Sequence, residues 1–298
     1  MKKILISASN GPIMLELISY LRKSFYVIGI DSNSNGLAKK YCNEFYKSPK
    51  GNDPKFINFL KKIGNKVDKI FLFVDEELKN VSKNLKNLKK IKDKIVISPK
   101  RTIFLCDNKE NLKKYLNKIE NINIPTFKRN KLNIIKPNIG RGSKNIIISK
   151  NKSLLKLFSK NNKYLVEEFI KGKEYTVDCL FDNNGNLIFS LPRERISAQN
   201  VSIIGKIIKD PKIDKIVKNI SKKITFYGPI NIQIIKAKKK YFLVEINPRL
   251  SGSIIFSIKS GFDPFSILSK LFSKKKMNLK KIKYNKTFFR YLSSFHES

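Results

Sequence analysis

The sequence predicts two fold classes in succession, a doubly wound parallel α/β unit followed by an α+β body. In the first hundred residues short apolar runs alternate with segments of helical spacing, the pattern of parallel strands joined by crossover helices. Beyond Arg101 the apolar runs follow one another across short polar turns, which indicates antiparallel strands. With 298 residues, 41% of them hydrophobic, the chain can bury a core in each part.

The first unit is expected to span residues 1–99 and to end at Pro99. Its opening loop, Ser7 to Pro12, lacks the G-x-G-x-x-G glycines that let a backbone approach a pyrophosphate, although the following strand ends in Asp31. We therefore interpret this unit as a structural or substrate-side domain and not as a dinucleotide site. The predicted strands are 3–8, 26–30, 69–74 and 95–98, and the predicted helices are 13–23, 56–62 and 76–88.

The second unit is expected to span residues 100–298, with residues 109–162 forming a flap or lid subdomain. Its predicted helices are 108–119, 154–159, 214–224 and 264–272, and its predicted strands are 133–136, 146–149, 164–170, 174–181, 187–191, 230–235 and 241–246. The turn Asp182-Asn183-Asn184-Gly185 separates two of these strands.

The formal net charge of +40 raises the question of a polyanionic partner. Lysines are spread from Lys2 to Lys286 and do not gather on one segment, whereas clustering is what marks a nucleic-acid footprint. We interpret the charge as a solvated lysine coat that helps to attract ATP and other anions. A basic surface for nucleic acid is the alternative.

Residue usage excludes several kinds of chemistry and location. The single histidine, His296, leaves no basis for a histidine base or a Ser-His-Asp triad. Cys42, Cys106 and Cys179 are far apart in the chain, so we expect buried thiols in a reducing compartment. No run approaches the roughly 18 to 20 apolar residues of a membrane span, and we expect a cytoplasmic protein without membrane contact.

A glycine-rich hairpin supplies the first candidate site. Gly140, Arg141, Gly142 and Ser143 lie between two apolar strands, where exposed backbone N–H groups can hold phosphate oxygens. Lys136, four residues upstream, adds a positive charge. An ordinary hairpin is the alternative interpretation.

The second candidate site lies on a strand near residue 245. Alternation along this strand places Glu245 and Asn247 on one face, with Val244 and Ile246 directed into the core. Gln233 on the preceding strand would lie beside Glu245 if the two strands pair, giving oxygen ligands suited to Mg²⁺. Arg249, just beyond the strand, could meet a transferring phosphoryl group. A set of surface polar residues is the alternative.

Together these segments resemble the ATP-grasp superfamily, and most of all its single-copy proteins similar to one half of the carbamoyl-phosphate synthase large subunit. The resemblance covers roughly residues 100–270, with weaker motifs in residues 1–99. It rests on Lys136-Pro137, the hairpin at 140–143, the segment from Val166 to Asp178, Gly228 to Gln233, and Val244 to Gly252.

The resemblance implies a role for each candidate residue. Arg249 and Lys136 would act in catalysis, Gln233, Glu245 and Asn247 would hold Mg²⁺ (or Mn²⁺), and Arg193 and Arg195 would face the substrate. ATP would contact Lys109, Lys136, Gly140, Gly142, Ser143, the hinge of Glu167, Phe169 and Ile170, and Glu174 at the ribose.

We therefore expect an ATP-dependent ligase that activates a small carboxylate as an acyl phosphate for attack by an amine or related nucleophile. A single ATP unit argues against making carbamoyl phosphate by two sequential phosphorylations. We expect no nucleic-acid partner and allow for a homodimer. The alternatives are a non-catalytic nucleotide-binding or regulatory protein and a basic protein that binds nucleic acid.

Overall fold

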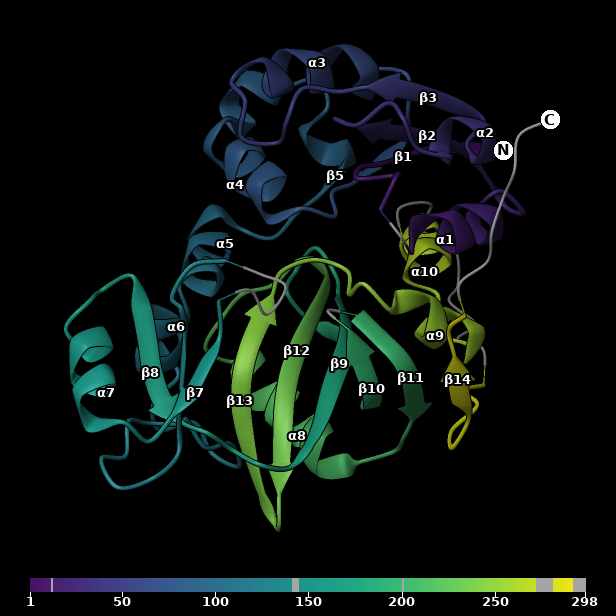
Figure 1. The fold of residues 1–298 in the computed structure, drawn as a ribbon. Helices are drawn as coiled ribbons and strands as arrows, with labels where there is room; N and C mark the ends of the chain where they lie inside the picture. Colours follow the sequence, from purple (N-terminus) through teal and green to yellow (C-terminus); the bar gives the residue numbers. More distant parts are fainter. Residues whose placement is uncertain (12, 141–144, 200, 272–280, 292–298) are drawn as a thin grey trace.

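The computed structural model describes residues 1–298 except 12, 141–144, 200, 272–280 and 292–298. It contains three sheets, which Figure 1 shows as separate bodies: a parallel sheet at the top, a small sheet at the left and a large sheet at the centre and right. The predicted change from parallel to antiparallel pairing is confirmed.

The N-terminal unit is a five-stranded parallel sheet in the order β3-β2-β1-β4-β5. Its strands are β1 (Lys2–Ile6), β2 (Phe25–Asp31), β3 (Glu44–Lys47), β4 (Lys69–Phe71) and β5 (Ile95–Val96). The helices are α1 (Met14–Leu21), α2 (Ala38–Tyr41), α3 (Lys55–Gly64), α4 (Asp75–Lys83) and α5 (Lys100–Asp107), with 3-10 turns at Leu85–Leu88 and Lys92–Lys94. The strand order reverses between β1 and β4, which is where doubly wound folds place their ligands.

The large sheet has six antiparallel-paired strands in the order β13-β12-β9-β10-β11-β14. They are β9 (Lys173–Phe181), β10 (Leu187–Gln199), β11 (Val201–Ile207), β12 (Gly228–Ala237), β13 (Lys240–Asn247) and β14 (Thr287–Phe289). Helix α8 (Pro211–Ser221) covers one face with Ile213, Ile216, Val217 and Ile220, whose spacing forms one helical stripe. Asp210 caps this helix by accepting a hydrogen bond from the Lys212 amide.

The small sheet, in the order β7-β6-β8, forms a separate lobe. It consists of β6 (Asn133–Pro137), β7 (Ile147–Ser149) and β8 (Tyr164–Glu168), covered by α7 (Lys152–Ser159). Residues 109–162 do not coincide with this lobe, because β8 lies beyond 162. In addition, Leu112 and Leu116, in and just after α6 (Lys109–Tyr115), are buried in the core of the large sheet. The domain boundaries at 99 and 100 remain a proposal.

A single core joins the N-terminal unit to the large sheet. Side chains of α1 and β1, such as Leu17 and Ile6, share a buried cluster with Phe256 of α9 (Ile254–Lys259) and Phe265 of α10 (Pro264–Leu271). This contact fixes the carboxyl ends of the parallel strands relative to the large sheet.

Several elements were not predicted. Strand β10 continues to Gln199 instead of ending at Leu191, and its partner β11 follows it. The added part of β10 is polar, and it is held by ion pairs of Arg193 with Asp178 and of Arg195 with Glu174 on the neighbouring strand β9. Helices α2, α5 and α9 and the short strands β3 and β14 were also missed.

Two predicted features of composition can be compared with the structure. The three cysteines are free and buried, as expected. In the part of the chain that the structure describes, no helix combines the length and apolar character needed to cross a membrane.

Phe226 tests the core of the large sheet. It has no exposed surface, and its ring centroid lies 5.2 Å from that of Phe181. Replacing Phe226 with Ala leaves a cavity, so we expect the free energy of unfolding to fall by about 3–5 kcal/mol in urea denaturation. Leu157→Ala on α7, where the side chain is 67% exposed, should change it by less than about 0.5 kcal/mol. Equal losses in the two variants would contradict this description of the core.

Candidate functional site

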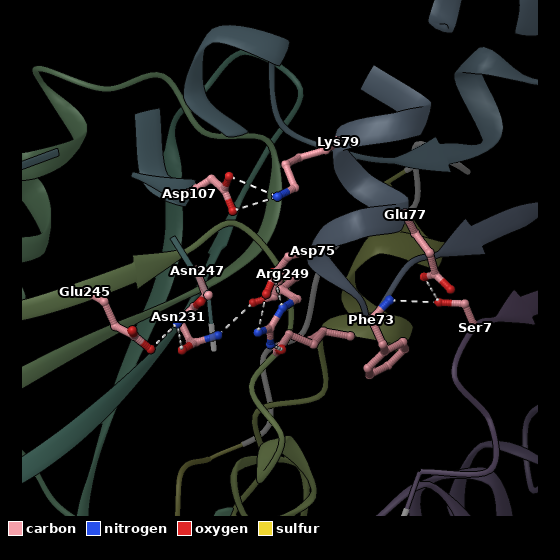
Figure 2. A network of polar contacts seen from close by, with 12 residues as sticks. Ser7, Phe73, Asp75, Glu77, Lys79, Asp107, Asn231, Glu245, Asn247 and Arg249 are labelled. Carbon is pink, nitrogen blue, oxygen red and sulfur yellow. Dashed lines mark hydrogen bonds and ion pairs between the residues drawn. The ribbon is translucent and has the colours of Figure 1, made fainter. Parts of the chain in front are cut away.

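The predicted metal ligands converge on one face of the large sheet. The antiparallel register of β12 and β13 pairs Gln233 with Glu245 and Asn231 with Asn247. Gln233 Nε2 donates to Glu245 Oε1 at 2.7 Å, and Asn247 Nδ2 donates to the same oxygen at 2.9 Å. Asn247 Nδ2 also lies 3.3 Å from Asn231 Oδ1 (Figure 2). The four side chains therefore form one polar cluster, which we call the amide–carboxylate cluster.

A β-bulge sets the orientation of this cluster. The register jumps after the pair Gln233–Glu245, so that Ile234 opposes Leu243 and Val244 is the extra residue. Val244 is consequently only half-buried, whereas Leu243 and Ile246 are buried in the core. The prediction that Val244 points into the core is wrong, because simple alternation fails at a bulge.

The amide–carboxylate cluster fits a hard divalent cation. Mg²⁺ prefers oxygen ligands and commonly uses one or two carboxylates together with waters and substrate phosphates. Among the described residues no three His, Cys, Asp or Glu side chains group as ligands. Within this cluster Glu245 would be the charged ligand, and turning the amides of Gln233 and Asn247 would present their oxygens. The assignment of these three residues remains a prediction.

A cleft opens beside the amide–carboxylate cluster and brings residues of both units together. Its lining comprises Asp75, Leu78, Lys79, Ile103, Cys106, Asp107, Lys109, Gly140, Glu245, Ile246, Asn247 and Pro248. Lys109 Nζ donates to the Gly140 carbonyl at 2.7 Å. Burial lowers the pKa of Lys109, although the Glu245 carboxylate opposes the shift. Two predicted phosphate contacts thus lie in the same cleft as two predicted metal ligands.

Lys136 belongs to a second buried cluster, in which two lysines share one carboxylate. Lys136 Nζ lies 2.8 Å from Glu167 Oε1, and Lys113 Nζ pairs with Glu167 Oε2. All three side chains are buried. Burial, followed by repulsion from Lys136, lowers the pKa of Lys113 to about 7 despite the attraction of Glu167. The cluster therefore gains one positive charge when Lys113 takes up its proton.

The predicted adenine hinge follows this cluster on β8. The Glu167 carboxylate is occupied by the two lysines, so its side chain is not presented to a ligand. The Phe169 amide donates to the Leu132 carbonyl at 2.8 Å, and Phe169 and Ile170 are half-buried. The structure therefore leaves fewer groups for a nucleotide here than the sequence predicts.

The residues predicted to contact the ribose and the substrate are engaged in ion pairs or buried. Glu174 and Arg195, expected at the ribose and the substrate, form an ion pair with each other. Arg193 has no exposed surface, because its guanidinium lies against Asp178, Ser202 and Ser251. The structure does not bring Arg193 to a surface that a substrate could reach. Gly142 and Ser143 lie outside the described residues.

Arg249 lies at the end of β13, next to the amide–carboxylate cluster. Its guanidinium forms a two-bond ion pair with Asp75 of α4, with Nε 2.6 Å from Oδ1 and Nη2 3.1 Å from Oδ2 (Figure 2). Sequence reasoning predicted Arg249 but missed its partner.

Four charged residues near these clusters were missed: Lys113, Asp75, Lys79 and Asp107. Lys113 carried a usable signal, since it follows Lys109 by four residues and therefore lies on the same helix face. Lys79 and Asp107 form an ion pair at 3.0 Å between α4 and α5. Their proximity to the site depends on how the two units dock, which no local pattern predicts.

Lys113 should make the stability of the protein depend on pH. Between pH 7 and about 10 the unfolded chain keeps the Lys113 proton while the folded protein loses it, so the free energy of unfolding should rise with pH by at most about 1.4 kcal/mol per pH unit. Lys113→Met removes this contribution. The unfolding free energy of the variant minus that of wild type, measured in urea at pH 7, 8 and 9, should therefore decrease as pH rises. The matched control is Lys114→Met, whose exposed side chain pairs with Glu110. A difference for Lys113→Met that stays constant with pH would contradict the lowered pKa.

Comparisons with known proteins bear on the fold of the chain. A family model described as "ATP-grasp in the biosynthetic pathway with Ter operon" matches residues 160–291. No curated protein sequence matches the chain.

Solved structures resemble the whole fold. N5-carboxyaminoimidazole synthetase from Staphylococcus aureus, complexed with ADP, is 17% identical with a TM-score of 0.72, over 97% of this chain and 80% of that one. Biotin carboxylase from Campylobacter jejuni is 16% identical with a TM-score of 0.71, over 96% and 74%. L-amino acid ligase from Bacillus licheniformis is 16% identical with a TM-score of 0.68, over 91% and 73%. The three-sheet architecture, the matching family model and these structures show that the chain has the ATP-grasp fold.

Proposed function

We propose that the protein is an ATP-dependent ligase that joins a small carboxylate to an amine or related nucleophile. The observation that carries this proposal is the convergence of Gln233, Glu245 and Asn247 beside a cleft that also holds Lys109. Positively charged groups and a cation-binding set in one cleft suit a nucleoside triphosphate.

The residues would divide the work as follows. Lys109 and Lys136 bind phosphate oxygens, and Glu245, Gln233 and Asn247 hold the metal. Bound there, Mg²⁺ or Mn²⁺ supplies charge neutralisation for the phosphates. Arg249 stabilises charge on the γ-phosphoryl group.

The proposed reaction has two steps. A carboxylate oxygen of the substrate attacks the γ-phosphorus, and the bond to the bridging oxygen breaks to release ADP. The amine then attacks the acyl carbon, phosphate leaves, and the proton of the amine passes to solvent. Both steps depend on positioning and electrostatics, and neither needs a histidine base.

The named activities of similar structures support this class of reaction. The Staphylococcus aureus protein is a synthetase with bound ADP, and the Bacillus licheniformis protein is an L-amino acid ligase. Cytoplasmic location and a homodimer remain predictions.

The function can be tested with a panel of amino acids and small carboxylates. Purified protein with MgATP is assayed for ADP release that depends on the added acid, and hydroxylamine is included to trap an acyl phosphate as a hydroxamate. Release together with hydroxamate supports the ligase. Nucleotide binding without release for any acid would favour a nucleotide-binding protein without turnover.

Glu245→Gln should abolish acid-dependent ADP release. The substitution keeps the size of the side chain but removes the charge that a divalent cation needs. Glu194→Gln is the matched control, since Glu194 lies on β10 of the same sheet and pairs with Lys173, away from the cluster. Thermal unfolding of both variants should stay near wild type. Unchanged turnover in Glu245→Gln would contradict the assignment of Glu245 as a metal ligand.

A further inference from the structure

The N-terminal unit contributes a charged residue to the site through the loop where its strand order reverses. Strand β4 ends at Phe71, and α4 begins at Asp75, so Asp75 lies at the reversal between β1 and β4. The residue it meets, Arg249, is 174 positions later in the chain. This contact therefore depends on the docking of the two units.

Arg249 is held on two sides. Its backbone belongs to the end of the large sheet, because the Arg249 amide donates to the Asn247 carbonyl at 2.8 Å and its carbonyl accepts from Asn231 Nδ2 at 3.0 Å. Its side chain belongs to the N-terminal unit through the two bonds to Asp75, and Nη1 donates to the Leu250 carbonyl at 3.2 Å. The planar guanidinium is thus fixed in orientation.

The loop that carries Asp75 is itself held in place by hydrogen bonds to Ser7, the residue after β1. The Ser7 hydroxyl, just after β1, donates to Glu77 in the first turn of α4 and accepts from the Phe73 amide at 2.9 Å (Figure 2). Ser7 and Glu77 are both buried. These bonds tie the β4–α4 connection to β1, so Asp75 is presented from a rigid support.

We propose that Asp75 is a positioning residue for Arg249, which makes the N-terminal unit part of the phosphoryl-transfer site. This inference rests on the proposed function, in which Arg249 stabilises the γ-phosphoryl group. A neutral residue at position 75 would free the guanidinium to turn away from the amide–carboxylate cluster. Misplacement of one charged group near the reacting atoms is enough to slow a reaction strongly.

The first test separates rate from binding in Asp75→Asn, which is nearly isosteric. We expect kcat for acid-dependent ADP formation to fall about 10- to 100-fold, with KM for ATP changed less than about threefold. Asp75→Glu, which keeps the charge, should recover part of the loss. The matched control is Glu16→Gln, because Glu16 of α1 pairs with Lys259 of α9 and so also joins the N-terminal unit to the rest of the chain. Equal losses in Asp75→Asn and Glu16→Gln would show that only the docking of the units matters, and would overturn the proposal.

A double-mutant comparison tests whether Asp75 acts through Arg249. If it does, Asp75→Asn combined with Arg249→Lys should be no slower than Arg249→Lys alone. Losses that multiply would show that Asp75 acts independently, and would overturn the proposal.

Nucleotide affinity tests the positioning role of Asp75 without requiring turnover. Calorimetry with MgADP and with a non-hydrolysable MgATP analogue gives the added affinity due to the γ-phosphate in wild type. Asp75→Asn should reduce that added affinity and leave ADP binding unchanged. If wild type releases no ADP with any acid but this difference is seen, the ligase proposal fails and the positioning role stands. If wild type turns over and Asp75→Asn is unaffected in rate and binding, the ligase stands and the positioning role fails.

Discussion

The antiparallel register of β12 and β13 is the constraint on which the site depends. It places Gln233 opposite Glu245 and Asn231 opposite Asn247, and because cross-strand partners share a face, four polar side chains meet there. A shift of β13 by one residue would turn Glu245 and Asn247 toward the core covered by α8. The bulge at Val244 helps to secure this register, because it keeps both Leu243 and Ile246 buried on the other face.

The overall composition does not reveal which charged residues are buried near the candidate site. The lysine coat gives a net charge of +40, yet three lysines near the candidate site are buried: Lys109 beside Gly140, and Lys113 and Lys136 on Glu167. A buried lysine is costly unless it is paired, and here one carboxylate serves two of them.

The two units are joined by a shared core and by a polar contact at the cleft. The shared core, with side chains of α1 and β1 packed against α9 and α10, holds the carboxyl ends of the parallel strands close to the large sheet. The pair of Asp75 with Arg249 then crosses the same boundary at the site itself. This arrangement explains why a domain without a nucleotide fingerprint still contributes residues to the cleft.

The sequence by itself determined the order of parallel and antiparallel parts and the strands that carry Gln233, Glu245 and Asn247, because apolar alternation and local turns are short-range signals. It also indicated Lys109 and Lys136 through family resemblance. It did not reveal that Arg193 would be enclosed by Asp178, Ser202 and Ser251, that Glu174 and Arg195 would pair, or that Asp75 would hold Arg249. Those outcomes depend on contacts between residues distant in the chain, and only the tertiary structure decided them, because hydrophobic packing fixes how the units dock and no local pattern records the partner of a charge.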